Sequence, residues 1–241
     1  MNLPKKLLTA IVAPLGAAAL LGGLVGCGGD DGTASEDTAT DSAVDSREDV
    51  ASRLHEAQLS GFQGLERVEE ESHAGRYGEL DAVREAAENR DSVTLDKPEC
   101  ADPTRQWGEL PEVREAPASL ALFRGENGAI THILLRLPED LAAQAVDTVP
   151  SEECATYEAT MEDGSSHSYT VRELDIETIG DQSRGIVVET ESEEGEALLY
   201  SLLYRDGQHL GAVSMLGGPD AEQRIVDFAT AALDYQNEVL G

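Results

Sequence analysis

The side chains that most often carry catalysis or bind metals are spread through this chain without the spacing that such chemistry needs. Ser183 lies between two glycines, but its segment is not the Gly-x-Ser-x-Gly turn of a hydrolase nucleophile. A zinc site needs three or four converging ligands, and no histidines occur as His-x-His or His-x-x-x-His. We therefore expect no catalytic residue, no metal site and no cofactor, and hence no enzyme. The five histidines are His55, His73, His132, His167 and His209.

Three other residues are candidates for binding a ligand. Trp107 is the only tryptophan, and we expect it to pack in the core or line a cleft. Arg124 and Arg136 stand at the ends of adjacent predicted strands, where they could bind an anion or balance nearby acids. The acidic runs at 69–71 and 191–196 lack the spacing of a calcium loop and are interpreted as solvated faces, with weak calcium binding left open.

Cys27 stands at the end of an N-terminal segment with the layout of a secretory signal. Residues 1–6 carry Lys5 and Lys6 and no acid, and residues 7–26 are apolar. The alternative is a transmembrane helix, because twenty residues can span a bilayer. Pro14 and the glycines argue against it, since they disfavour a helix. The Leu-Val-Gly-Cys at 24–27 resembles the lipobox of bacterial lipoproteins.

In that family the preceding segment is cleaved and the cysteine thiol carries a diacylglycerol. The resemblance therefore implies a signal peptide at 1–26 and a lipoprotein whose first residue, Cys27, bears fatty acids such as palmitate. Each buried CH₂ contributes about 0.8 kcal/mol, and two chains suffice for stable anchoring. We expect the product to be lipid-anchored to the cell membrane at its extracytoplasmic face.

The two remaining cysteines, Cys100 and Cys154, then have only each other as partners. An extracytoplasmic compartment permits disulfides, and closing a loop of this size stabilises a fold by roughly 4 kcal/mol in the chain-entropy model. The alternative is a reactive or metal-binding thiol pair. The chain has no Cys-x-x-Cys and no histidine near either residue. We therefore predict a disulfide.

The chain is strongly acidic, with 48 acidic and 17 basic residues. Two of the basic residues and none of the acidic ones lie in the leader, so the remainder has a formal charge of −33. Such a charge repels nucleic acid and anionic lipid head groups, which argues against both as partners. The acids otherwise indicate a well-solvated surface.

The elements that must position these residues begin after an acidic, low-complexity stretch. Residues 27–49, the lipidated cysteine and its tether, contain too little apolar surface to order and are predicted to be disordered. Residues 50–241 form one domain. A hairpin at 119–124 and 130–137 is followed by a helix from Pro138 to Val149, and by a run of strands from 156 to 215.

A final helix follows Asp220, with Gln223 placed for a capping box. Its apolar stripe comprises Ile225, Phe228, Ala229, Ala232, Leu233 and Val239. Runs of strands with a few helices indicate the α+β class. We predict a curved antiparallel sheet of about six strands, with helices packed on one side and one disulfide.

Four segments occur here in the order found in a known group of domains. They are Leu-Ser-Gly-Phe at 59–62, Lys-Pro-Glu-Cys-Ala-Asp at 97–102, Glu153-Cys154 after a helix, and a final strand followed by a helix. Over residues 54–241 the chain resembles the extracytoplasmic sensor domain of mycobacterial serine/threonine kinases and its stand-alone lipoprotein relatives.

The resemblance implies a sensor domain that binds a ligand or partner in a cleft between helices and a curved antiparallel sheet. The kinase-attached form carries two disulfides, whereas only the pair matching Cys100 and Cys154 is available here. The chain also lacks the glycine-rich loop, His-Arg-Asp and Asp-Phe-Gly motifs of a kinase, so any signal must pass through another protein.

These observations predict a membrane-anchored, non-catalytic binding domain whose partner is an unknown envelope ligand or membrane protein. The alternative is a lipid or glycolipid carrier of the cell envelope. An aromatic content of 4% supplies little to line a large pocket for such cargo. An envelope hydrolase is a third, less favoured class.

Overall fold

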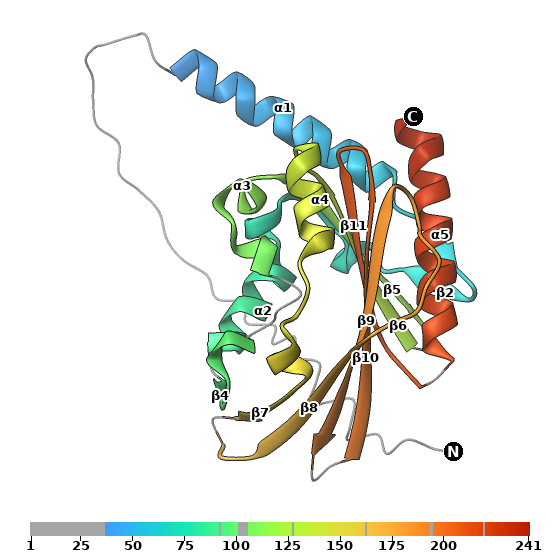
Figure 1. Ribbon diagram of the computed structural model, residues 1–241. Helices are drawn as coiled ribbons and strands as arrows, with labels where there is room; N and C mark the ends of the chain where they lie inside the picture. The colour runs from blue at the N-terminus through green and yellow to red at the C-terminus, as the bar shows by residue number, and fades with distance from the viewer. Residues whose placement is uncertain are drawn as a thin grey trace, which may run out of the picture. The chain divides into compact units, whose positions relative to one another are not determined.

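The structure is a computed structural model that describes residues 37–91, 93–100, 106–126, 128–161, 163–192, 195–218 and 220–241 (Figure 1). Cys27, the predicted signal peptide and the start of the predicted tether lie outside the described residues. Ala43–Gly241 is a single compact unit. It is built on one antiparallel sheet with helices, which confirms the α+β class.

The sheet has 11 strands in the order β1-β2-β5-β6-β11-β10-β9-β8-β7-β4, with β3 paired to β5. The longer strands are β5 (Pro117–Gly125), β6 (Gly128–Arg136), β7 (Thr156–Thr160), β8 (Ser166–Glu173), β9 (Gln182–Ser192), β10 (Gly195–Asp206) and β11 (His209–Leu216). The short ones are β1 (Gly61–Phe62), β2 (Leu65–Arg67), β3 (His73–Arg76) and β4 (Thr94–Leu95). The prediction of about six strands was wrong, because strands of two to four residues show no usable alternation.

Two predicted hairpins are confirmed. Gly125 pairs with Gly128 where β5 turns into β6. Asp206 pairs with His209 where β10 turns into β11, and Gly207 there has a φ of 55°, which favours glycine. These turns fix the register of β5, β6, β10 and β11, the four strands that line the cleft described below.

Helices cover both faces of the sheet, so the prediction that they pack on one side was wrong. Helix α5 and the C-terminal part of α1 contribute side chains to clusters on one face, whereas α2, α3 and α4 contribute to a cluster on the other (Figure 1). Both faces of the central strands are apolar, which requires cover on each. The helices are α1 (Asp37–Glu56), α2 (Asp81–Asp91), α3 (Pro111–Arg114), α4 (Glu139–Asp147) and α5 (Ala221–Leu240). Short 3₁₀ turns are η2 (Glu69–Glu71), η3 (Tyr77–Glu79), η4 (Pro98–Cys100), η5 (Gln106–Glu109) and η6 (Glu152–Ala155).

Helix α1 begins earlier than the sequence predicted. It starts at Asp37, so residues 37–49, predicted to belong to the disordered tether, are helical. Leu54 and Ala57 near its C-terminal end are buried against Leu134 of β6. This packing holds the C-terminal end of the helix against the sheet.

Helix α5 buries the predicted stripe, and Phe228 is its centre. The Phe228 ring lies 5.2 Å from that of Phe62, 5.1 Å from that of Phe123 and 5.6 Å from that of His132, all nearly edge-on. The predicted capping box was wrong. Asp220 makes no side-chain cap, and Gln223 Nε2 instead donates to Asp227 Oδ1 at 2.8 Å.

A buried polar network joins α1 to the sheet. Gln58 Oε1 lies 2.6 Å from Nδ1 of His132, and Gln58 Nε2 donates to the carbonyl of Ser119 at 3.1 Å. The Tyr204 hydroxyl lies 3.0 Å from Nε2 of His132. Burial lowers the pKa of His132 to about 3 and raises that of Tyr204. Gly211 is required beside the network, because a Cβ there would overlap the Tyr204 ring.

The predicted disulfide between Cys100 and Cys154 is confirmed. It joins η4 to η6, closes a sequence separation of 54 residues, and is fully buried. Lys97 supports the same junction by donating from Nζ to the carbonyl oxygens of Glu153 and Thr156. The bond therefore ties the segment after β4 to the segment before β7.

A candidate ligand-binding cleft

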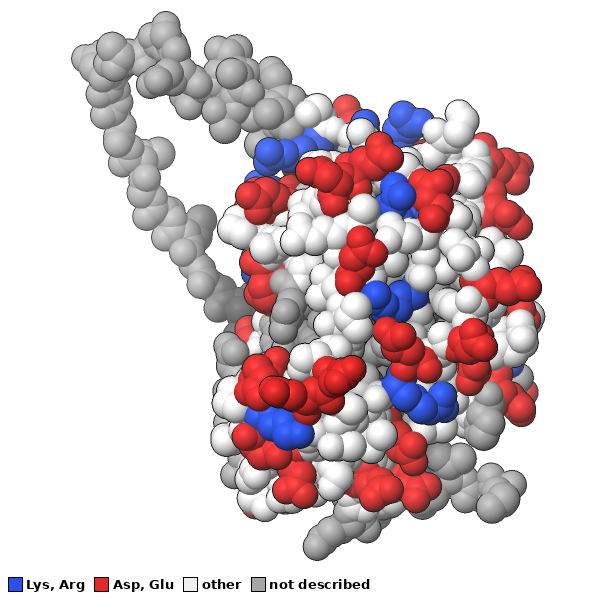
Figure 2. All heavy atoms as spheres, in the orientation of Figure 1, with Lys and Arg blue, Asp and Glu red and all other residues white. Residues whose placement is uncertain are grey.

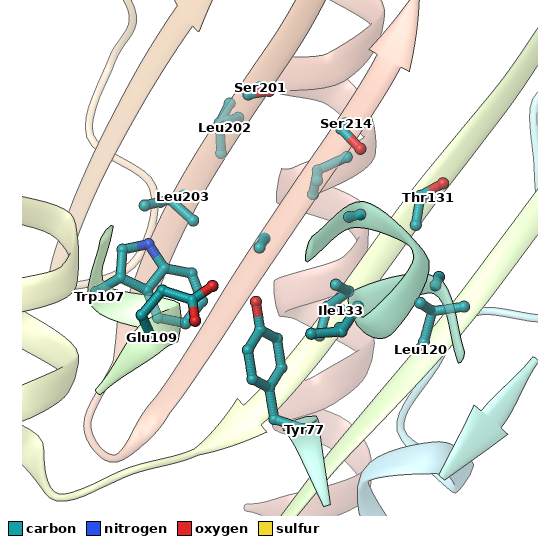
Figure 3. Close-up of a pocket in the computed structure, with 15 residues that line it drawn as sticks. Tyr77, Trp107, Glu109, Leu120, Thr131, Ile133, Ser201, Leu202, Leu203 and Ser214 are labelled. Atoms are coloured by element: carbon teal, nitrogen blue, oxygen red, sulfur yellow. The ribbon is translucent and has the colours of Figure 1, made fainter. Parts of the chain in front are cut away.

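A cleft of about 210 Å³ lies between α2 and one face of the sheet (Figure 3). Strands β5, β6, β10 and β11 form its floor, and Ala82, Val83 and Ala86 of α2 form one wall. Turns η3 and η5 close one end with Tyr77, Trp107 and Glu109. Elements from four parts of the sequence thus meet around one hollow.

The floor consists of two rows of side chains that the strand register sets side by side. One row is apolar and crosses the sheet as Leu120, Ile133, Ala212 and Leu203. The next row carries hydroxyls and consists of Thr131, Ser214 and Ser201. Hydroxyls both donate and accept hydrogen bonds, so the floor presents polar groups beside an apolar strip.

The closed end of the cleft is aromatic and acidic. The rings of Tyr77 and Trp107 lie 5.7 Å apart at an angle of 32°, and both side chains are largely buried. Figure 3 shows the Tyr77 hydroxyl and the Glu109 carboxylate directed into the hollow. Glu109 Oε2 lies 3.5 Å from Nη1 of Arg114, which holds the carboxylate in place. A side chain at Gly108 would press on the Tyr77 hydroxyl, so glycine there lets the ring approach η5.

The structure places the three candidate ligand-binding residues in three separate locations. Trp107 forms part of the cleft wall while being almost fully buried, and its role in binding stays a prediction. Arg124 makes two bonds to the Glu71 carboxylate, at 2.9 and 3.2 Å, on the surface. Arg136 lies at the other end of the β5–β6 hairpin, where it pairs with His209. The two arginines therefore stand at the ends of adjacent strands, as the sequence indicated, but at opposite ends of the hairpin.

Sequence reasoning missed Tyr77, Glu109 and the row of hydroxyls. The alternation of Ser201 with Leu203, and of Ala212 with Ser214, shows that each pair shares a strand face. The hairpin turn at Asp206-Gly207 sets Ser201 opposite Ser214, but nothing local gives the register of β6 against β11, which brings Thr131 beside them. Tyr77 and Glu109 lie in 3₁₀ turns, whose positions no periodicity predicts.

The residues with catalytic potential have structural contacts instead. Ser183, at the start of β9, accepts a hydrogen bond at Oγ from the Ile179 amide at 2.9 Å. His132 is buried in the network beneath α1. Among the residues that the structure describes, no group of three or more His, Cys, Asp or Glu side chains is placed to hold a metal ion. Within the same residues, no helix is both long and apolar enough to cross a bilayer.

No protein-family model and no curated protein sequence matches the chain. Among solved structures, it is similar to the extracellular domain of PknH from Mycobacterium tuberculosis. The TM-score is 0.50 at 14% identity, over 78% of this chain and 96% of that domain. The chain has the fold of that domain. This confirms, at the level of the fold, the resemblance to mycobacterial kinase sensor domains that the sequence indicated.

A second similar structure is a putative uncharacterized protein of Mycobacterium smegmatis, the Rv0999 ortholog. Its TM-score is 0.42 at 13% identity, over 60% of this chain and 76% of that one.

Proposed function

We propose that this chain is a lipid-anchored, extracytoplasmic and non-catalytic sensor-like domain. It binds a cell-envelope ligand or a membrane-protein partner in the cleft between α2 and the sheet. The observation that carries the proposal is this cleft, with polar groups beside an apolar floor, in a fold shared with an extracellular domain. Concave sites with a few placed polar groups are the usual form of a small-molecule site.

The size of the cleft limits what enters it. Pockets for drug-sized ligands measure about 300–1,000 Å³, whereas this one measures about 210 Å³. The hollow therefore takes a small group, or one end of a larger molecule, with hydrogen-bonding atoms against Thr131, Ser214 and Ser201. A carrier of whole acyl chains needs a longer apolar cavity, so the carrier function is less favoured.

Anchoring through Cys27 places this domain outside the cell on the membrane that carries its partner. Because the chain has no kinase motif, ligand binding would be relayed by contact with another envelope protein. Growth with a clickable fatty acid tests the anchor. The wild-type protein should take up label and a Cys27→Ser variant should not. Equal labelling of the two, or recovery in the cytosol with residues 1–26 intact, would contradict the anchor.

Cleft binding is tested with the full chain extracted from membranes in non-ionic detergent and analysed by native mass spectrometry. Ser214→Leu projects a larger apolar side chain into the cleft, and Ser168→Leu makes the same change at an exposed position on β8. The wild type and Ser168→Leu should retain a bound envelope molecule or partner, and Ser214→Leu should lose it at an unchanged unfolding midpoint. Turnover of an envelope substrate, abolished by a single Ser or His substitution, would contradict the proposal.

A further inference from the structure

A second hollow, separate from the cleft, lies between α1, the C-terminal end of α5 and the turn from β10 to β11. Its volume is about 560 Å³. Three basic side chains from three elements line it: Arg53 of α1, Arg136 at the end of β6 and His209 at the start of β11. Figure 2 shows basic side chains gathered at the end of the face where α1 lies, with others scattered among the acidic side chains of the rest of that face.

These three residues form one electrostatic neighbourhood. Arg136 and His209 are register partners on adjacent strands. Burial lowers the pKa of His209, and the positive charges of Arg136 and Arg53 lower it further. Asp206, in the β10–β11 turn, raises this pKa, and Asp181 also lines the hollow.

The two arginines differ from most others in the chain. Neither Arg53 nor Arg136 has a carboxylate at ion-pair distance within the described ranges. Eight arginines do: Arg47, Arg67, Arg76, Arg84, Arg114, Arg124, Arg184 and Arg205. In a chain with 48 acidic residues, Arg53 and Arg136 thus line one hollow without either forming an ion pair within the described ranges.

Of the two acidic side chains that line the hollow, Asp206 acts on His209, and Asp181 is engaged elsewhere. Asp181 Oδ2 accepts the Gly207 amide at 2.9 Å and lies 3.3 Å from Nη1 of Arg205, so it serves to hold the turn. Arg136 is oriented by Nε, which donates to Gln208 Oε1 at 3.3 Å. The Leu137 amide donates a hydrogen bond to the Gln208 carbonyl at 2.8 Å, which holds Gln208 in place. Arg136 is therefore held in place with its terminal nitrogens left for a ligand.

We propose that this hollow is a binding site for a phosphate group, held by the guanidinium groups of Arg53 and Arg136 with His209 beside them. Planar guanidinium groups match phosphate oxygens with paired hydrogen bonds. The volume leaves room beyond one phosphate, which fits a phosphorylated small molecule or a phospholipid head group. The site lies away from the cleft, and the proposal does not depend on the function of the cleft.

Binding should take up a proton at His209. A bound phosphate offsets the positive charges of Arg53 and Arg136, and so raises the pKa of His209 toward its ordinary value. Phosphate itself also takes up a proton in this range, so the comparison is with His209→Gln: relative to that variant, the affinity of the wild type should increase as the pH falls from 7.5 to 6. Asp206 also raises the pKa of His209, but it does so with and without ligand. Its effect therefore does not change on binding.

The test is isothermal titration of the full chain in non-ionic detergent with inorganic phosphate and with pyrophosphate. Parallel titrations use micelles doped with phosphatidylglycerol or phosphatidylcholine. Arg53→Gln and Arg136→Gln should each weaken binding at least tenfold, because hydrogen bonds to a charged group are among the strong ones. Arg172→Gln is the matched control, since Arg172 is also exposed and has no ion pair among the described residues.

The titrations with soluble phosphates and those with doped micelles distinguish the two possible sources of the phosphate group. Binding of phosphate or pyrophosphate identifies a soluble ligand, and a response to phosphatidylglycerol but not to phosphatidylcholine identifies a lipid head group. His209→Gln should keep most of the affinity and remove the part of the pH dependence that His209 adds to the titration of the phosphate itself. The proposal is overturned if no probe binds, or if Arg53→Gln and Arg136→Gln change binding no more than Arg172→Gln does.

Discussion

Lowering the pH from 7 to 5 should weaken the fold through one buried histidine, His132. Its side chain is 1% exposed and lies between Gln58 and Tyr204. With Gln58 Oε1 as an acceptor, Nδ1 carries the proton and Nε2 accepts the Tyr204 hydroxyl. A second proton would need to sit at Nε2, where it meets that hydroxyl. The network therefore holds the imidazole neutral.

The magnitude follows from the pKa of His132, which burial lowers from 6.5 to about 3. As the pH falls, the unfolded chain takes up this proton first, so the unfolded state gains stability. The contribution of neutral His132 to the free energy of unfolding is complete above about pH 6.5. It is lost as the pH falls toward 3, and the total loss is about 5 kcal/mol. Roughly 2 kcal/mol of this loss should occur between pH 7 and pH 5.

The assay compares urea unfolding of the wild type and His132→Asn at pH 7 and pH 5. Asparagine keeps a donor near Gln58 and does not titrate, but it leaves the Tyr204 hydroxyl without an acceptor, which costs about 1–3 kcal/mol at pH 7. The wild type should lose about 2 kcal/mol more than His132→Asn between the two pH values. His73→Gln, at an exposed histidine, should follow the wild type. A difference between wild type and His132→Asn that does not change with pH would refute the reasoning.

Three further predictions concern the core. Gly211→Ala should destabilise the fold by about 2 kcal/mol or more in urea unfolding, because the new Cβ would overlap the Tyr204 ring. The control is Gly75→Ala, whose Cβ meets open space, and it should change stability by about 0.5 kcal/mol or less. Equal effects of the two would contradict the packing at Gly211. Phe228→Ala should lower the free energy of unfolding by about 3–5 kcal/mol, because it removes three ring contacts. Tyr235→Ala, at a more exposed position of the same helix, should lower it far less. Cys100→Ser with Cys154→Ser should cost about 2–4 kcal/mol in thermal or urea unfolding, and an unchanged midpoint would show that the disulfide does not constrain the unfolded chain.

Sequence reasoning predicted the elements whose patterns are long. The β5–β6 hairpin, the strand β11 and the buried stripe of α5 each extend over eight or more residues with a clear period. The disulfide followed from elimination, because only Cys100 and Cys154 remained. The segment Ala197–Tyr204 is apolar almost throughout, which indicates a strand covered on both faces, and Tyr200 and Leu203 belong to clusters on opposite faces.

What the sequence could not supply is register between distant segments. The cleft depends on Thr131 facing Ser214 across β6 and β11, and on Tyr77 and Trp107 meeting from two separate turns. The second hollow likewise depends on α1 packing beside the end of β6, which brings Arg53 near Arg136. None of these contacts has a local signal, because each joins residues far apart in the chain.

The central claim is that the cleft captures an envelope molecule or partner, and crosslinking from inside the cleft tests it most directly. A photoactivatable amino acid is placed at Ser201, in the cleft floor, or at Ser168, exposed on β8, and intact cells are irradiated. Crosslinks at Ser201 should yield a discrete adduct that is absent at Ser168 and is lost when Ser214→Leu is added. An adduct that forms equally at both positions, or that persists with Ser214→Leu, would contradict the account.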